Sequence, residues 1–373
     1  MSKWLQWLGH DDKDISRLNI IHVAGTKGKG STCAFAESFL RAHGQRTGFP
    51  QKTGMYTSPH LLSPEERIRI NFQPISRDLL TKYFFEVYET LKEKSPPEEF
   101  GRVPRYLQLW ALVSFHTFLR ERIDVAIVET HHGGEYDATN FIQHPAATVI
   151  AKLGMDHIAQ LGPTIENIAW HKAGIFKPGA PAFSTFQAPS LAKVLETRAR
   201  EKGVQLKFVS DETDLPDDTL KLTSHVQRQN AALALAAVES VLDRRGLKLT
   251  RDDVEVGAQQ FSWPGRFQII NDDAQKWFLD GAHNDISVRE AARWFADAHI
   301  LLSREHNPAL RVLIWSQISD QRESLEVLEI LARTLKEYNV PIQHVIFSTY
   351  NEHEGSGKYI VQMLIMQDRG INW

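Results

Sequence analysis

The chain has 373 residues, with 43 Lys and Arg against 46 Asp and Glu and a formal net charge of −3. One hydrophobic core rarely serves more than about 250–300 residues, so this length indicates two domains. The balanced charge argues against broad electrostatic capture of nucleic acid or of an anionic membrane. Hydrophobic residues make up 42% of the chain, which excludes wholesale disorder.

Cysteine content and the N-terminal sequence indicate the compartment. Cys33 is the single cysteine, so an intramolecular disulfide and a cysteine-based zinc or iron–sulfur site are excluded, and a reducing compartment fits best. No run approaches the roughly 20 apolar residues that span a bilayer. Residues 1–12 have only a short apolar patch interrupted by acids, unlike a signal peptide or a mitochondrial presequence. We therefore expect a cytoplasmic protein.

Strand and helix patterns alternate along the first two thirds of the chain. Short apolar runs predict buried strands at Ile20–Ala24, Val125–Val128, Thr148–Ala151, Phe183–Phe186 and Leu206–Val209. Helical spacing of apolar residues predicts helices at 30–43, Arg77–Lys94, Tyr106–Glu121, 164–174, 189–202 and Asn230–Leu242. This alternation is typical of a mostly parallel sheet covered by helices.

A domain boundary is predicted at residues 262–266, where Pro264 and Gly265 follow a helix. Beyond it, a second, smaller α/β set is predicted, with strands at 277–279, 311–315 and 343–348 and helices at 285–299 and 322–338. Within the first domain, residues 94–104 are predicted to form an exposed loop.

A glycine-rich loop follows the first strand and opens a helix. Its residues are Gly25, Thr26, Lys27, Gly28, Lys29, Gly30, Ser31 and Thr32. Glycines let backbone N–H groups converge on an anion, the helix N-terminus adds positive potential, and Lys29 can reach terminal phosphates. The loop departs from the usual phosphate-loop pattern because Gly30 stands between Lys29 and Ser31. We interpret it as a phosphate-binding loop rather than an ordinary strand–helix turn.

Six segments with distinctive motifs follow one another along the chain: His22–Thr32; Tyr56–Leu61 with Glu66–Asn71; Glu129 with Gly133–Gly134 and Asp137–Asn140; Leu153–His157 through Gly162; Ile168–Lys177; and Pro264–Arg266 with Leu279–Asn284. Together and in this order they resemble the folylpolyglutamate synthases, members of the Mur ligase superfamily. The resemblance implies an α/β fold: a phosphate-loop ATPase-type domain with a mostly parallel sheet, then a smaller Rossmann-like C-terminal domain. We expect an ATP-binding Mur ligase-type domain at 1–262 and a shortened C-terminal ligase domain at 263–373.

The resemblance implies an ATP-dependent ligase that forms carbon–nitrogen bonds. Such ligases use ATP to activate a carboxylate as an acyl phosphate, which an amine then attacks to give an amide. The expected reaction adds glutamate to tetrahydrofolate, with Mg²⁺ as the metal and small molecules as partners. The alternative is a specialised Mur-type ligase that joins a non-folate acid to an amino acid or another amine. A nucleotide-binding protein that has lost catalysis is a third reading, which the retained site residues oppose.

Three side chains offer a hydroxyl, a carboxylate and an imidazole for Mg²⁺: Ser58, Glu129 and His157. Magnesium needs few protein groups because it keeps several waters. Glu129 ends a strand, and the carboxyl ends of parallel strands are where such sheets bind ligands. A buried histidine such as His157 is otherwise more often a core residue; its position in the motif favours the metal role. Lys172 resembles the lysine that is carbamylated in this superfamily.

The remaining candidates come from both predicted domains. Arg266 can neutralise phosphate charge, Asp280 can hold a ribose or an ammonium group, and His283 can face the amino acid or ATP. Asn230 resembles the family's adenine-side asparagine, with helix-surface polarity as the equal alternative. Asp137 and Asn140, after the double glycine, are expected to shape the rim beside Glu129. The active site is then expected between the two domains.

Two departures from the family pattern bear on specificity. His131 and His132 stand where the family usually has small or apolar residues and glycine. At least one imidazole is expected to face the acid substrate or the metal, although loop divergence is the simpler alternative. The chain is also shorter after His283 than the family usually is, which predicts a loosened or remodelled amine pocket.

Overall fold

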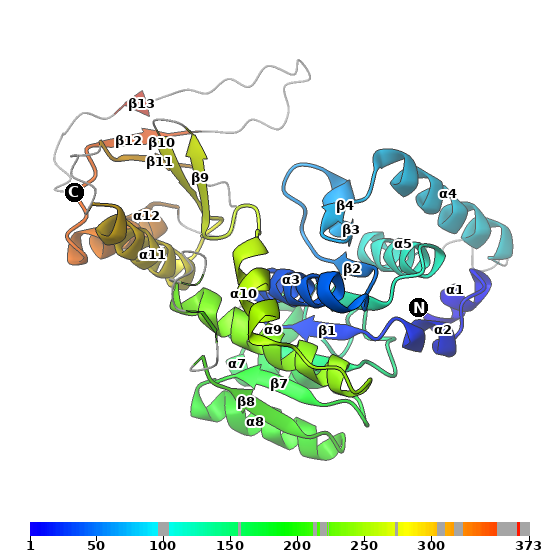
Figure 1. The fold of residues 1–373 in the computed structure, drawn as a ribbon. Helices are drawn as coiled ribbons and strands as arrows, with labels where there is room; N and C mark the ends of the chain where they lie inside the picture. Colours follow the sequence, from blue (N-terminus) through cyan, green and yellow to red (C-terminus); the bar gives the residue numbers. More distant parts are fainter. Residues whose placement is uncertain are drawn as a thin grey trace. The chain divides into compact units, whose positions relative to one another are not determined.

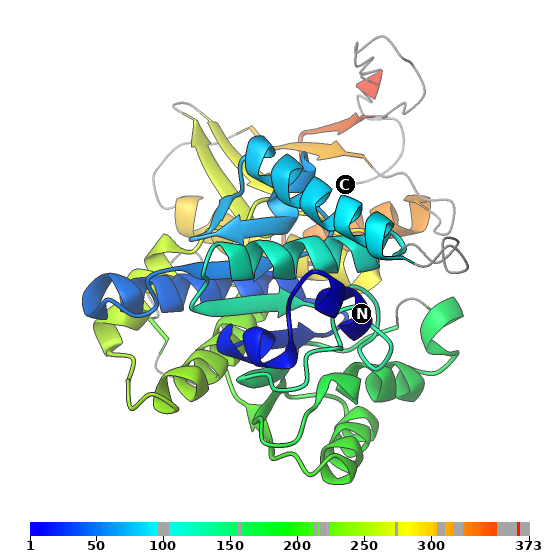
Figure 2. The ribbon, with the colours of Figure 1, turned by 90° about the vertical axis from the view of Figure 1, so that its right-hand side faces the viewer.

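The computed structural model describes residues 1–95, 104–155, 158–211, 215–216, 222, 224–272, 275–303, 310–316, 324–348 and 364–365. The chain divides into two compact units, Met1–Trp263 and Pro264–Trp373. Figures 1 and 2 show the elements of each unit from two directions. The fold is α/β in both units, as the sequence predicts.

The first unit contains an eight-stranded sheet in the order β4-β3-β2-β5-β1-β6-β7-β8. Its strands are β1 (Ile21–Ala24), β2 (Thr53–Tyr56), β3 (Ile68–Ile70), β4 (Gln73–Pro74), β5 (Val125–Glu129), β6 (Ala147–Ile150), β7 (Ala182–Thr185) and β8 (Leu206–Val209). The strands from β2 to β8 in this order pair in parallel, whereas β3 and β4 pair antiparallel at one edge. The mostly parallel sheet is confirmed.

Helices cover both faces of this sheet (Figure 1). On one face α3 (Lys29–Thr47) packs against α9 (His225–Asp243) and α10 (Arg251–Gln260). The other face carries α1 (Ser2–Trp7), α2 (Asp12–Arg17), α4 (Arg77–Lys94), α5 (Tyr106–Arg120), α7 (Ile165–Lys172) and α8 (Pro189–Glu201), and the short α6 (Ile158–Leu161) precedes α7.

Strand periodicity explains the two separate cores. Successive side chains of a strand point to opposite faces, so Ile21 and Val23 join the core under α3. Ile20 instead packs in the core beneath α4 and α5. Because both faces are buried, the central strands are apolar nearly throughout, and they were recognisable as short continuous hydrophobic runs.

The second unit contains a β-hairpin, β9 (Gln268–Asp272) with β10 (Gln275–Leu279). Its other strands are β11 (Val312–Trp315), β12 (His344–Phe347) and β13 (Leu364–Ile365); β11 and β12 are parallel. Helices α11 (Asp285–Ser303) and α12 (Ser324–Glu337) pack together through apolar residues that include Val288 and Leu331. The smaller α/β unit is confirmed.

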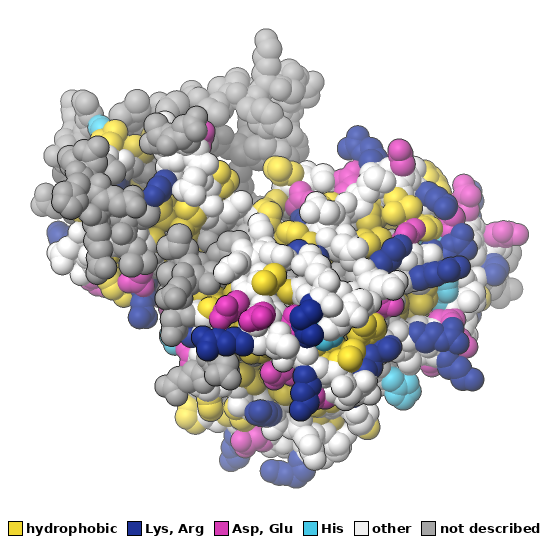
Figure 3. Space-filling view, viewed as in Figure 1, with side chains coloured by type: hydrophobic (Ala, Val, Ile, Leu, Met, Phe, Trp, Pro, Cys, Tyr) yellow, Lys and Arg dark blue, Asp and Glu magenta, His cyan; other side chains and the backbone are white. Residues whose placement is uncertain are grey.

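The predicted strands and helices all appear within a few residues of their expected bounds, and α4 has the same bounds as predicted. The sequence interpretation missed α1, α2, α6, β2, β3, β4, β9 and β13, and it gave no bounds for α10, the helix that precedes Pro264. Most of the predicted loop 94–104 lies outside the described residues. No described helix is long and apolar enough to cross a membrane. On the face shown in Figure 3, basic and acidic side chains are interspersed over the first unit.

Candidate active site

The glycine-rich loop connects β1 to α3. Gly28 is the N-cap of α3 with φ of 82°, in the left-handed region that glycine adopts most easily. A Cβ at Gly28 would lie 2.2 Å from Asn230 Oδ1, so any larger residue would have to displace the Asn230 side chain. The first N–H groups of α3, from Lys29 onward, have no carbonyl partner within the helix. They and the positive end of the helix form a site suited to an anion.

The start of the loop is held against the segment that follows β6. The N–H groups of Thr26 and Lys27 both donate to the carbonyl of Lys152, at 2.9 and 3.1 Å. The Thr26 hydroxyl exchanges hydrogen bonds with the Gly154 backbone. On the other side, buried Lys172 at the end of α7 donates from Nζ to the carbonyl of Gly25 at 2.7 Å. The loop is therefore fixed before Gly28.

Glu129 ends β5 beside this loop and is buried. Its Oε1 lies 3.5 Å from Lys29 Nζ, and its Oε2 accepts a hydrogen bond from the Ser58 N–H at 3.3 Å. Burial raises the pKa of Glu129, although Lys29 and the Ser58 N–H oppose the rise. The structure thus brings together three of the predicted residues at the carboxyl edge of the sheet.

The double glycine after Glu129 is required by a close backbone approach. A Cβ at Gly134 would lie 2.6 Å from the carbonyl oxygens of both His171 and Lys172. The Glu135 N–H donates to the same His171 carbonyl at 2.7 Å. The end of α7 is therefore seated directly on this loop, which places Lys172 under the phosphate loop.

The rim residues are structural supports as well as polar groups. Asn140 donates from Nδ2 to the carbonyls of Glu135 and Gly174. Asp137 accepts the N–H groups of His131 and His132, each at 2.8 Å. Burial would raise the pKa of Asp137, but contact with His131 and hydrogen bonds from Thr139 hold it well below its usual range.

The two histidines occupy different environments. The His131 side chain is buried: its Nε2 lies 2.6 Å from the Tyr56 hydroxyl and its Nδ1 lies 3.3 Å from Asp137 Oδ1. His131 is enclosed by Tyr56 and Asp137 and therefore does not face a substrate. His132 is exposed, so the expectation that at least one of the two imidazoles faces the substrate or the metal rests on His132 alone.

Asn230 is buried on α9, so the helix-surface alternative is wrong. It donates to Gln227 and its Oδ1 lies 3.5 Å from the Thr32 hydroxyl. Asn230 therefore lies beside Gly28 and the first turn of α3. His157 lies outside the described residues. Within the described ranges no three His, Cys, Asp or Glu side chains form a metal cluster. Mg²⁺ does not require one.

The second unit brings Arg266, Asp280 and His283 together where β10 leads into α11. The Asp280 carboxylate accepts the N–H of Phe267 at 2.8 Å, and Arg266 Nη1 donates to its neighbouring carbonyl. The N–H of Gly281 donates to the Gly265 carbonyl, which joins the two motifs. His283 Nδ1 lies 2.8 Å from the Gly281 carbonyl. The two segments that flank the β9–β10 hairpin thus form one polar cluster.

Arg67 belongs to the Glu66–Asn71 motif, and the structure gives its side chain an unusual setting. The buried guanidinium lies over the rings of Tyr106 and Trp110, at 5.5 and 5.4 Å. Its Nε donates to His60 Nδ1, whereas Nη1 is buried without a hydrogen-bond partner. Arg67 is therefore a further candidate for binding an anionic group. The arginine gave no periodic signal that would have identified this role.

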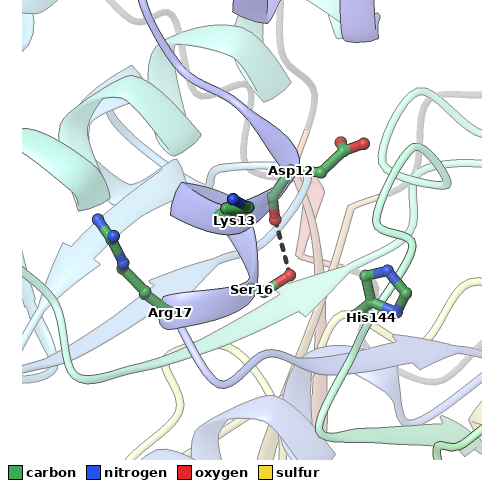
Figure 4. A pocket seen from close by; sticks show the side chains of 5 residues that line it. All are labelled: Asp12, Lys13, Ser16, Arg17 and His144. Carbon is green, nitrogen blue, oxygen red and sulfur yellow. Dashed lines mark hydrogen bonds between the residues drawn. The ribbon is translucent and has the colours of Figure 1, made fainter.

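A surface depression of 340 Å³ lies elsewhere, lined by Asp12, Lys13, Ser16, Arg17 and His144 (Figure 4). Its residues precede β1 and β6, whereas the phosphate loop follows β1. Since β1 and β6 are parallel, this depression lies at the amino ends of the strands, and the phosphate loop lies at their carboxyl ends. It is not part of the candidate active site.

The fold and these contacts define a phosphate-loop α/β protein of the nucleotide-binding class. No protein-family model matches the chain. The chain is 40% identical over 361 residues to folylpolyglutamate synthase of Neurospora crassa, covering 94% of this chain and 68% of that one. It is also 40% identical over 369 residues to the mitochondrial folylpolyglutamate synthase of Homo sapiens, covering 91% and 61%.

Among solved structures, Mycobacterium tuberculosis folylpolyglutamate synthase complexed with ADP matches with a TM-score of 0.74 and 25% identity. That match covers 93% of this chain and 76% of the other. The chain belongs to the folylpolyglutamate synthase family.

Proposed function

We propose that the protein is an ATP-dependent ligase that adds glutamate to tetrahydrofolate by forming an amide bond. The observation that carries the proposal is the juxtaposition of the phosphate loop with Glu129 and Ser58 at one edge of the sheet. Family membership supports the reaction and its substrates. The proposed division of labour gives residues 1–262 the binding of ATP and residues 263–373 a part in the ligase reaction.

The residues present fit ATP and Mg²⁺. Backbone N–H groups at the start of α3 and the Lys29 ammonium suit phosphate oxygens. The Glu129 carboxylate and Ser58 hydroxyl are the hard oxygen groups that Mg²⁺ prefers, with His157 as a further candidate. Mg²⁺ would supply a Lewis acid that neutralises phosphate charge. When ATP binds, Lys29 would leave Glu129 and contact a phosphate oxygen. The Glu129 carboxylate would then be available for the metal.

The proposed chemistry is transfer of the γ-phosphoryl group of ATP to the folate carboxylate, which releases ADP. The glutamate amine then attacks the acyl phosphate, loses a proton and forms the amide as inorganic phosphate leaves. Lys29 stabilises charge on the transferred group because its side chain is held beside the phosphate nest. Arg266 does the same from the second unit. Asp280 and His283 orient the amine or the nucleotide, and Asn230 supports the nucleotide side because it lies beside Gly28 and Thr32 at the start of α3.

Lys172 is proposed to carry a carbamate when the enzyme is active. Its Nζ is buried and donates to the carbonyl of Gly25, the first residue of the phosphate loop. The modification is measured by 13C NMR of protein equilibrated with labelled bicarbonate, with Lys172→Arg as the control. A labelled carbamate signal that persists in Lys172→Arg would contradict the assignment.

Turnover against a panel of acids and amines tests the proposed function. ADP release should require Mg²⁺, tetrahydrofolate and glutamate together, and mass spectrometry should find the glutamylated folate. Exposed His132 on the rim favours a second candidate, a ligase for a different acid. ADP release with another acid, and none with folates, would support that candidate and overturn the first.

A cytoplasmic location is also proposed from the composition and the single cysteine. The name of the human relative places that protein in mitochondria, so fractionation of cells expressing the full-length gene product is the test. Recovery with the mitochondrial fraction would overturn the proposal.

A further inference from the structure

A chain of buried polar side chains lies beneath the candidate metal site. The Tyr56 hydroxyl lies 2.6 Å from His131 Nε2, and His131 Nδ1 lies 3.3 Å from Asp137 Oδ1. The same Oδ1 accepts the Thr139 hydroxyl at 2.7 Å. The Thr139 hydroxyl lies 2.8 Å from His22 Nε2. These five residues, His22, Tyr56, His131, Asp137 and Thr139, are called the His131 network.

The donors of the network can be assigned from Asp137. Its carboxylate accepts four hydrogen bonds, from three backbone N–H groups and the Thr139 hydroxyl. A carboxylate 3.3 Å from Nδ1 favours the tautomer of His131 with its proton on Nδ1. Nε2 is then left to accept the hydrogen bond that the Tyr56 hydroxyl donates. The Nδ1 contact lacks good hydrogen-bond geometry, so it is chiefly electrostatic.

The network joins β1, the end of β2 and the segment that follows β5. His22 lies on β1, three positions before the phosphate loop begins, and Tyr56 is the last residue of β2. Ser58 follows Tyr56 by two residues and donates its N–H to Glu129, and His131 follows Glu129 by two residues. The Tyr56–His131 contact is thus a second bridge between the two segments that Ser58 and Glu129 bridge directly.

We propose that His131 is a positioning residue, which fixes Tyr56 and thereby keeps Ser58 beside Glu129 in the geometry that the metal requires. The proposal rests on the proposed function, because it takes Ser58 and Glu129 as metal-binding groups. His131 occupies a position where the family resemblance predicts a small residue. This chain therefore uses an imidazole to satisfy the buried Tyr56 hydroxyl, which would be costly to leave unpaired.

The test uses the full chain and four variants: Tyr56→Phe, His131→Ala, the double variant and the control His144→Ala. His144 is an exposed histidine at the amino ends of the strands. Binding of Mn²⁺, as a spectroscopic substitute for Mg²⁺, is titrated by EPR in the presence of the non-hydrolysable analogue AMPPCP. Binding of AMPPCP alone and the thermal unfolding midpoint are measured on the same samples.

Tyr56→Phe and His131→Ala should each weaken Mn²⁺ binding by about tenfold, as loss of a group supporting a metal ligand does. The double variant should bind Mn²⁺ no more weakly than the weaker-binding single variant, because both substitutions remove the same Tyr56–His131 contact. Binding of AMPPCP without metal should stay within about twofold of the wild-type chain in all variants, and His144→Ala should match the wild type throughout. A purely structural role would lower the unfolding midpoint and leave the Mn²⁺ affinity of the folded protein unchanged.

The outcomes separate this inference from the proposed function. If the wild-type chain binds Mn²⁺ and Tyr56→Phe and His131→Ala bind it equally well, the positioning role is wrong while the proposed function stands. Additive losses in the double variant would also overturn it. If the wild-type chain with AMPPCP binds no Mn²⁺, the metal assignment and this inference both fail. Should His131→Ala not fold, Tyr56→Phe alone decides, because phenylalanine preserves the buried ring.

Discussion

Lys29 Nζ lies 3.5 Å from Glu129 Oε1, so the lysine of the phosphate loop is paired with the carboxylate that ends β5. Both side chains are largely buried, and each limits the cost of burying the other's charge. In the proposed function Lys29 contacts phosphate and Glu129 contacts the metal. The ion pair seen here must therefore separate when ATP and Mg²⁺ bind.

Replacing Lys29 by alanine should reduce ADP release by at least about a hundredfold, because charge stabilisation at the transferred phosphoryl group is lost. Glu129 would be left buried without its cation, so the free energy of unfolding should fall by about 1–3 kcal/mol. Steady-state turnover and denaturant unfolding measure the two effects.

The double variant Lys29→Ala/Glu129→Gln is the matched control for this prediction. It removes the unpaired charge and should recover most of the lost stability while staying inactive. Near-normal ADP release by Lys29→Ala would show that the loop does not act on a phosphoryl group.

Gly28→Ala and Gly48→Ala form a second matched pair at the two ends of α3. Both glycines have positive φ, 82° and 84°, so alanine should cost about 1 kcal/mol of stability at either position. A Cβ at Gly28 would collide with Asn230, whereas a Cβ at Gly48 has no described atom within 4 Å. Only Gly28→Ala should lose nucleotide affinity, measured by calorimetry with AMPPCP. Equal affinity in both variants would remove Asn230 and Gly28 from the proposed site.

His22 should make stability depend on pH. Burial lowers the pKa of His22 to about 3, so between that value and its ordinary pKa of 6.5 only the unfolded chain binds the proton. Stability from this residue is therefore fully present above about pH 6.5 and is lost as the pH falls. At about pH 5 the expected loss is roughly 2 kcal/mol.

The His22 prediction is checked by denaturant unfolding at several pH values in the wild-type chain and in His22→Gln. The variant should show a shallower dependence between about pH 5 and 6.5, since other titrating groups are common to both proteins. Parallel curves would mean that His22 is protonated in the folded state.

Asp280 can be tested for a role beyond its hydrogen bond to Phe267, which has a positive φ of 47°. Asp280→Asn keeps an acceptor oxygen and should retain stability within about 0.5 kcal/mol, whereas Asp280→Ala should lose about 1–2 kcal/mol. If the carboxylate contacts a substrate, Asp280→Asn should still lose most turnover. An active Asp280→Asn with an unstable Asp280→Ala would make Asp280 purely structural.

Most strands and helices could be predicted from local sequence patterns. The apolar runs that became β1, β5 and β6 are short and bounded, and the spacing in Arg77–Lys94 gave both ends of α4. In contrast, β2, β3 and β4 are short and contain polar or proline residues, including Gln73 and Pro74. Their strand conformation depends on pairing with neighbours, which no local pattern reveals.

The roles of site residues could be predicted where they belong to one contiguous segment. They could not be predicted where they depend on contacts between segments that are distant in the sequence. Lys29 and its loop are contiguous, so their chemistry could be inferred from residue types. The burial of His131 depends on Tyr56, which is 75 positions away in sequence. Its neighbour His132 has the same side chain but is exposed, so residue type alone could not distinguish the two.

The close approach at Gly134 also has a consequence for protein engineering. Two carbonyl oxygens would lie 2.6 Å from any Cβ there, so a mutant library that randomises this position would consist mostly of misfolded members. Exposed Tyr136 and His132 flank the same rim without that restriction. A search for variants with altered acid preference is therefore best confined to those two positions, and most of its sampled sequences would then encode folded ligases.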